Sequence, residues 1–303
     1  MKTYRLAAMA AVVLLAVGCT KDNGKADRIS IFANGMDGNG AKVWVDPADV
    51  NDATWVAGES IDLNGNPYTI NGNGNGSFSL DVEPLEEAMY AVYPAATESE
   101  GDTIDVTNGN GPGATITLKS LAVNFRDGGH RIVFPMAAQA AAESGSLFFD
   151  HLTAGLRLTL ENSANSGYAI DHLKVVVQGT AAAGDVEIGG VSYTVAWAVQ
   201  GPTTPSGNIG GIEDDRSVGY SSEMNFRMQT NGVAGVTVPA KDGGVNGSIS
   251  FCVPVTVCEL QRISITGYDA SGVQLFTKSK SIDSDRPNLE VNHMYHIQAF
   301  TIN

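Results

Sequence analysis

The feature of this 303-residue chain that most limits its fold is the dipeptide Asn-Gly, which recurs between short segments of alternating apolar and polar residues. Asn-Gly favours the type I′ turn, whose twist joins two antiparallel strands through two residues. No segment has a strong helical period to compete with this pattern. The sequence therefore predicts an all-β protein built from tight hairpins. The dipeptide begins at Asn34, Asn39, Asn64, Asn71, Asn73, Asn75, Asn108, Asn110, Asn231 and Asn246.

Several strands can be placed from their period-2 alternation. Residues 29–33 (ISIFA) form one, and residues 60–70 are expected to form a strand, a turn and a second strand. In 147–162, Leu156, Leu158 and Leu160 would lie on one face of a strand. Residues 269–272 are the expected loop of a later hairpin. The alanine-rich segment 135–144 has enough helix formers for a short helix.

The length and the even spacing of the strands favour two β-sandwich domains. A break near Ser144-Gly145 divides the chain into an N-terminal β-sandwich at 29–145 and a C-terminal one at 146–303. The formal net charge of −15 argues against a nucleic-acid partner, because phosphates require a basic surface.

The N-terminus is typical of a lipoprotein. Lys2 and Arg5 precede an uncharged segment, Leu6 to Gly18, which is shorter than the ~20 residues that span a bilayer as a helix. A basic start, a short apolar segment and a small residue describe a secretory signal. Cys19 follows at once, in a lipobox-like sequence, Ala-Val-Gly-Cys. We expect residues 1–18 to be a signal peptide, Cys19 to be acylated and residues 19–28 to be a polar tether.

Two further cysteines, Cys252 and Cys258, lie in the segment FCVPVTVCEL. If this segment is one strand, their sulfur atoms are roughly 20 Å apart, too far for a disulfide with each other. Both are then expected to be small buried side chains.

No catalytic motif is present, and we expect no enzymatic activity and no cofactor. The chain lacks a nucleophile elbow, a zinc-protease motif, a phosphate loop and an EF-hand loop. His293 and His296 are three residues apart in an expected strand, so they would point to opposite faces and share no metal ion. His130, His151 and His172 are expected to make local hydrogen bonds. The acidic loops 212–216 and 283–286 are typical of solvated loops, although carboxylates there could hold Ca²⁺.

Four segments, in order, resemble the fimbrillin family. They are ATWVAGESIDLNGNPYTI with its Trp, Gly-acidic and Asn-Gly pattern, MYAVYPA with its Tyr-Pro, FFDHLTAGLRLTLEN, and the closing RPNLEVNHMYHIQAFTI. The resemblance implies two transthyretin-like β-sandwich domains in tandem. It also implies a type V pilin, exported as a lipoprotein to the outer surface of a Gram-negative cell. In that family a trypsin-like protease removes the first strand, and the opened groove accepts a strand from the next subunit.

In this chain the strand corresponding to the removed one is residues 29–33. Two basic residues lie near it and are candidate processing sites. Arg28 directly precedes the strand, and Lys42 is the only basic residue between Ile29 and Trp55. A cut at Arg28 would release the lipid but leave the strand in place. The position of the subunit as stalk, anchor or tip stays open.

The alternative is a surface-anchored lipoprotein that binds a glycan or another ligand and does not polymerise. Such a protein needs an exposed aromatic platform. Trp44, Trp55 and Trp197 are the candidates, although the strand patterns around Trp55 and Trp197 favour a place in the core.

Overall fold

All regular secondary structure in the described part of the chain is β, which confirms the all-β prediction. The computed structural model describes residues 28–33, 44–45, 55, 58–70, 78–99, 102–108, 112–126, 129–180, 185–188, 191–197, 220–255, 257–282 and 288–303. These segments contain no helix with the length and hydropathy needed to cross a membrane.

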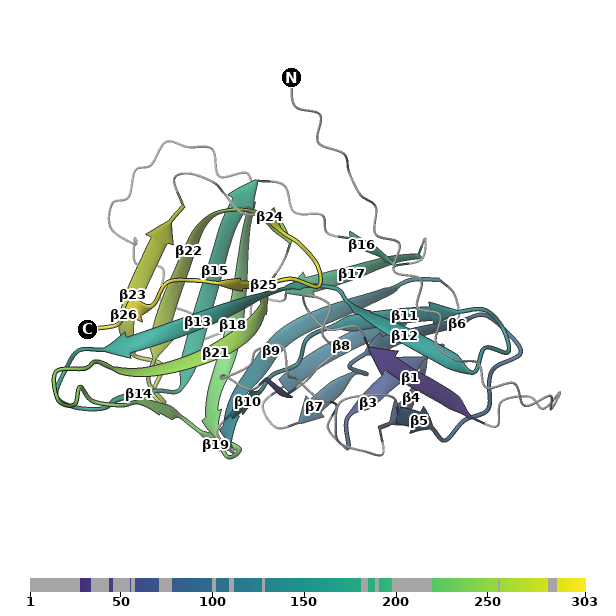
Figure 1. Ribbon diagram of the computed structural model, residues 1–303, viewed down its shortest axis with the longest axis horizontal. Helices are drawn as coiled ribbons and strands as arrows, with labels where there is room; N and C mark the ends of the chain where they lie inside the picture. The colour runs from purple at the N-terminus through teal and green to yellow at the C-terminus, as the bar shows by residue number, and fades with distance from the viewer. Residues whose placement is uncertain are drawn as a thin grey trace, which may run out of the picture.

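One sheet of the described residues has seven strands and comes from the first half of the chain. Its order places the first strand, β1, between β12 and the short edge strand β5 (Figure 1). In spatial order the strands are β4 (Asn66–Thr69), β3 (Ser60–Leu63), β6 (Met89–Tyr93), β11 (Met136–Ala140), β12 (Ser146–His151), β1 (Ile29–Ala33) and β5 (Phe78–Leu80).

A second sheet has thirteen described strands and takes them from both halves of the chain. Its main path is β16 (Asp185–Ile188), β17 (Val191–Trp197), β9 (Ala114–Arg126), β18 (Tyr220–Thr230), β15 (His172–Thr180), β22 (Cys258–Tyr268) and β23 (Gln274–Ser281). Beside this path lie β2 (Trp44–Val45), β7 (Thr97–Ser99), β8 (Asp102–Asn108), β10 (Gly129–Arg131), β19 (Val233–Ala234) and β24 (Asn288–Leu289).

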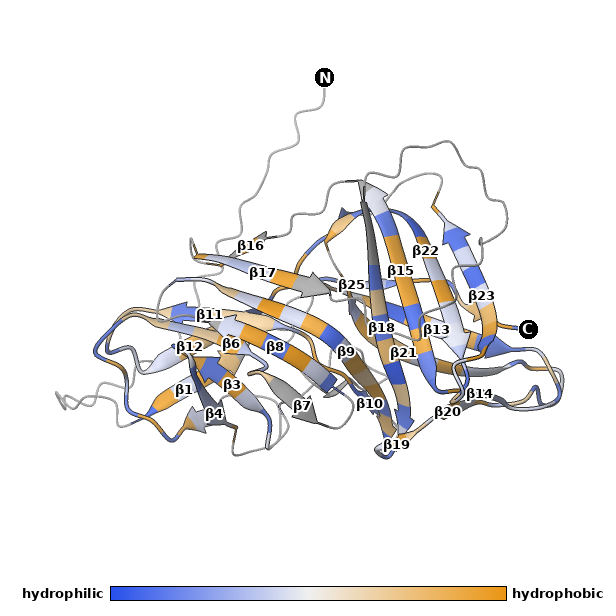
Figure 2. Ribbon diagram, turned by 180° about the vertical axis from the view of Figure 1, so that it is seen from behind, coloured by the Kyte–Doolittle hydropathy of each residue, from blue (hydrophilic) through white to orange (hydrophobic). Residues whose placement is uncertain are grey.

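Two smaller sheets complete the described fold. In the first, β13 lies between β21 and the C-terminal strands, and its Leu156, Leu158 and Leu160 are buried as predicted. Figure 1 shows β13 and β21 in front of β15, β18 and β22, and Figure 2 shows the same layers from behind. The strands are β21 (Gly247–Val255), β13 (Ala154–Asn162), β25 (Met294–His296) and β26 (Phe300–Thr301), and then β14 (Tyr168–Ile170) and β20 (Val236–Val238).

The long strand β9 joins the two halves of the large sheet. Its residues 114–118 pair with β17, and its residues 121–125 pair in parallel with β18. The large buried apolar side chains fall on even numbers up to Leu118 and on the odd numbers 121 and 123 after it, although the small Ala122 is buried as well. At the same place the register with β8 shifts by one residue, which leaves Lys119 without an opposite residue in the strand pairing. This β-bulge keeps the apolar side chains on one face of the strand although their numbering changes phase.

The expected hairpins are confirmed at two places. Asn64 and Gly65 join β3 to β4, and both have positive φ (50° and 80°), as a type I′ turn requires. Between β22 and β23, the Asp269 carboxylate accepts hydrogen bonds from the backbone N–H groups of Ser271 and Val273, at 2.9 Å each.

Two expectations about local structure were wrong. In the alanine-rich segment 135–144, residues 136–140 form the strand β11 and not a helix, and this strand pairs with β6 and β12. The segment FCVPVTVCEL is two strands, since β21 ends at Val255 and β22 begins at Cys258. Both Cys252 and Cys258 are nevertheless buried, as predicted, and both are free thiols.

The division into two domains at residue 145 remains a prediction. Strand β12 begins at Ser146 but pairs with β11 and β1 of the first sheet. The chain then passes through Leu152 and Thr153, both buried, into β13.

Two buried histidines lie where the sheets meet. The backbone N–H of Cys252 donates to Nε2 of His130 at 2.8 Å, so this ring accepts a hydrogen bond from β21 and is neutral. His151 packs edge-on against Phe134 at 5.8 Å between ring centroids. Burial lowers the pKa of each of these two histidines to about 4.

We predict that acid destabilises the protein between pH 6.5 and pH 4. The unfolded chain takes up protons on these histidines below about pH 6.5, whereas the folded chain keeps them neutral to about pH 4. Each histidine then removes on the order of 3 kcal/mol from the free energy of unfolding. Urea unfolding at pH 7, 5.5 and 4.5 measures this loss. His151→Phe should reduce it by about half, and the same substitution at the exposed His293 should not.

Candidate functional site

The candidate site is the slot that β1 fills between β12 and β5, which we call the β1 slot. The residues that build it alternate along β1. Ile29 and Ile31 point inward and are fully buried, whereas Ser30 and Phe32 point outward. Full burial of an isoleucine side chain contributes about 1.5–3 kcal/mol, so the two inward residues hold the strand firmly in the sheet.

Both edges of β1 are paired. Along β12 the pairing is parallel and sets Ile31 beside Leu147 and Phe32 beside Phe148. Along β5 it is antiparallel and sets Ile31 beside Phe78. Within the described residues, β5 has no sheet neighbour other than β1. Loss of β1 would therefore open one edge of β12 and leave β5 without its partner.

Hydrogen bonds also fix the point where the chain enters the slot. The backbone N–H of Ile29 donates to the carbonyl of Val82 at 3.0 Å, and that of Ser30 donates to the carbonyl of Gly145 at 2.9 Å. Just before them, Arg28 forms an ion pair with Asp81 at 3.3 Å, and both of these side chains are exposed. The strand is thus secured from its first residue.

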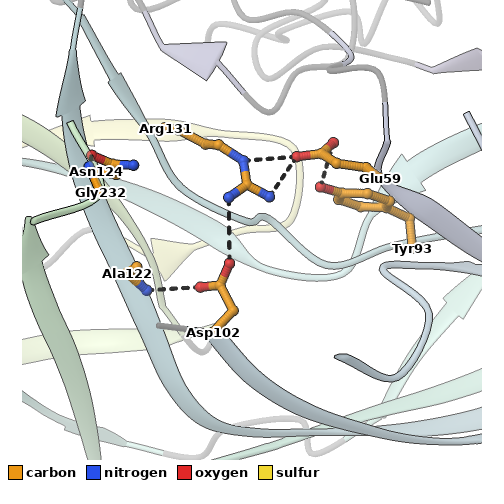
Figure 3. A network of polar contacts seen from close by, with 7 residues as sticks. All are labelled: Glu59, Tyr93, Asp102, Ala122, Asn124, Arg131 and Gly232. Atoms are coloured by element: carbon orange, nitrogen blue, oxygen red, sulfur yellow. Dashed lines mark hydrogen bonds and ion pairs between the residues drawn. The ribbon is translucent and has the colours of Figure 1, made fainter. Parts of the chain in front are cut away.

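A buried polar network connects the sheet that contains the β1 slot to the large sheet (Figure 3). Glu59 precedes β3 and Tyr93 ends β6, both in the first sheet, whereas Asp102 and Arg131 lie on β8 and β10 of the large sheet. The Arg131 guanidinium binds Glu59 at 2.8 Å and Asp102 at 3.7 Å. Tyr93 donates its hydroxyl proton to Glu59 at 3.0 Å. We call these four residues the Arg131 network.

Within the Arg131 network, the Arg131 guanidinium is charged and the Tyr93 hydroxyl is neutral. Burial and the neighbouring Glu59 carboxylate raise the pKa of Tyr93 well above its usual range. For Arg131, burial alone would lower the pKa, but Glu59, Tyr93 and Asp102 outweigh it and raise the pKa. Asp102 also accepts a hydrogen bond from the backbone N–H of Ala122 at 2.7 Å. Its charged groups are paired with one another, and its residues come from both sheets, so the network is a structural link between the two sheets.

The structure brings only one of the predicted site residues to the β1 slot. That residue is Arg28, directly before β1; its role in processing remains a prediction. Cys19 and Lys42 lie outside the described residues, as do the acidic loops 212–216 and 283–286.

Of the three tryptophans, only Trp55 has a described side chain. It is buried, with its ring 5.2 Å from that of Tyr93 and 5.9 Å from that of Phe149. Trp55 is therefore a core residue, as its strand pattern suggested. Trp44 and Trp197 lie in β2 and β17, and their side chains are not among those that the structure describes.

The histidines do not form a metal site in the described residues. His293 and His296 are both exposed, and His172 binds Asp171 at 2.6 Å. No group of three or more potential metal ligands occurs in the part of the chain that the structure describes.

Comparisons with known proteins give a distant structural likeness. No protein-family model matches the chain, and no curated protein matches it in sequence. One similar solved structure is described as a "putative cell adhesion protein" from Bacteroides ovatus ATCC 8483. The match covers 89% of this chain and 90% of that one, with 14% sequence identity and a TM-score of 0.37.

We predict that Arg131→Met strongly destabilises the fold. Removing the guanidinium takes away the cation that faces the buried carboxylates of Glu59 and Asp102, and breaking a buried ion pair in this way costs about 3–5 kcal/mol. Chemical unfolding of the purified protein measures the cost. Arg28→Met, the same change in the exposed pair with Asp81, should leave the unfolding midpoint unchanged. Equal midpoints for both variants would contradict a structural role for the network.

Proposed function

We propose that this chain is a structural or accessory subunit of a cell-surface fimbria, assembled by strand exchange at the β1 slot and supporting adhesion. The observation that carries the proposal is the placement of β1. This strand stands at the start of the described chain, yet it fills an inner position of the first sheet, with pairing on both edges and two buried isoleucines.

A strand in such a position suits exchange for a physical reason. Its removal exposes the N–H and C=O groups of β12 and β5, together with the apolar space that Ile29 and Ile31 fill. A strand from another subunit can satisfy both at once, through main-chain hydrogen bonds and side-chain pockets. The same contacts that stabilise β1 in one chain would then join two chains.

The remaining features of the proposal rest on the lipoprotein-like N-terminus and on the resemblance of four segments to the fimbrillin family. The chain would fold as two transthyretin-like β-sandwich domains in tandem. It would be exported as a lipoprotein and anchored in the outer membrane, exposed at the cell surface, through acyl chains on Cys19. Its partners would be other fimbrial subunits and ligands on host or bacterial surfaces. We propose no catalytic activity and no cofactor.

The two candidate processing sites lead to different products. A cut after Lys42 separates β1 from the rest of the chain, so the strand can leave the β1 slot. A cut after Arg28 removes only the tether, and β1 stays attached at its C-terminal end. Only the first product would accept a strand from another subunit.

We predict that protein taken from the native cell surface begins within residues 34–54 and lacks β1. Mass spectrometry of its N-terminal peptide tests this. Lys42→Gln should retain β1 and reduce incorporation into filaments, whereas Arg28→Gln should change neither. Retention of an acylated Cys19 peptide in all surface molecules would mean that β1 is kept and the tether is permanent. That result would overturn strand exchange at the β1 slot and leave an anchor subunit or a non-fimbrial lipoprotein.

A further inference from the structure

An aromatic pair lies on the outer face of the β1 slot. The rings of Phe32 on β1 and Phe148 on β12 are stacked, with centroids 4.9 Å apart and planes 13° from parallel. Phe148 is 56% exposed even with Phe32 in place. It is the one aromatic ring among the exposed large apolar side chains of the described residues.

This pair is not part of the core. The inward positions of the same two strands are held by Ile29, Ile31, Leu147 and Phe149, all fully buried. An exposed aromatic ring gains little by burial, but a stacked pair adds an attraction of its own. The parallel register of β1 and β12 places the two rings side by side, so the contact depends on which residue occupies the position of Phe32.

The neighbouring outward positions are small. Ser30 pairs with Ser146 on one side and with Ser79 on the other. A strand in the β1 slot therefore meets three requirements: apolar residues at the two inward positions, a small residue between them, and a ring beside Phe148. The inward requirement is met by many apolar strands, because pockets of this kind discriminate weakly between similar side chains.

We propose that Phe148 is a specificity-determining residue, which selects an incoming strand with an aromatic side chain at the position of Phe32. The inference rests on the proposed strand exchange and names the chemistry of the partner strand. That strand runs parallel to β12 and carries the pattern apolar, small, apolar, aromatic. Because the selecting contact lies outside the core, it can vary without loss of the apolar fit inside.

The test uses the full chain with a specific protease sequence inserted between residues 36 and 37. After cutting, β1 can exchange with fluorescent synthetic peptides of residues 25–36, and anisotropy reports their affinity. The peptides are the native sequence, Phe32→Ser, the outward control Ser30→Thr, and the inward control Ile31→Ser. Each is measured on the native protein and on Phe148→Ser, whose folding is checked by circular dichroism and its unfolding midpoint.

On the native protein, Phe32→Ser should weaken peptide binding about 2- to 10-fold, and Ser30→Thr should not. On Phe148→Ser, the native and Phe32→Ser peptides should bind equally. An equal loss on both proteins, or no loss on either, would overturn the role of Phe148 while leaving strand exchange intact.

The Ile31→Ser peptide distinguishes a wrong role for Phe148 from a wrong proposal of strand exchange. Ile31→Ser should weaken binding roughly 10-fold or more on both proteins, because it removes a fully buried side chain. If no peptide enters the cut protein, or if Ile31→Ser binds as the native peptide does, strand exchange itself is wrong, and the selection by Phe148 fails with it.

Discussion

The described fold depends on the pairing of one long strand, β9, with neighbours from both halves of the chain. Strands β8 and β10 lie along one edge of β9, and β17 and β18 lie along the other. This strand of 13 residues twists along its length. Because its large apolar residues change from even to odd numbers, the later ones would point to the opposite face of the sheet without a correction. The bulge at Lys119 supplies that correction, so that Ile116 and Leu121 lie on the same face of one continuous sheet.

The β1 slot depends on β9 through a chain of contacts. Strand β10 pairs with β9 and carries Arg131, which binds Glu59 next to β3. From there the pairing runs through β6 and β11 to β12, the parallel neighbour of β1. Buried ion pairs contribute little net stability compared with apolar residues of the same volume, but they are exacting about geometry. The Arg131 network is suited to holding the first sheet in one position relative to the large sheet.

Local patterns in the sequence were enough to predict many of the strands and two of the turns, but they did not predict how the strands assemble. The alternation in residues 29–33 and the Asn64-Gly65 turn are short-range features, and the structure contains both. The strand β11 was missed because alanine carries little β preference, and the packing between two neighbours decides its conformation. Glu59 belongs to the Gly-acidic pattern of one family-like segment, but Arg131 is 72 residues away and lies in none of the four segments, so no sequence signal connects the two. The role of Phe148 depends on a parallel register that only the folded sheet reveals.

The two faces of β1 make different kinds of contact. Its inward residues interact with a closed core, where a change of one methyl group alters stability. Its outward residues meet solvent and one stacked ring, where a change alters the fit to a partner more than the stability of the fold. In a sheet the two faces alternate residue by residue, so a single strand can carry both without conflict. Under the proposed strand exchange, Ile29 and Ile31 would set the fit to the core, and the ring that faces Phe148 would select the strand, each without disturbing the other.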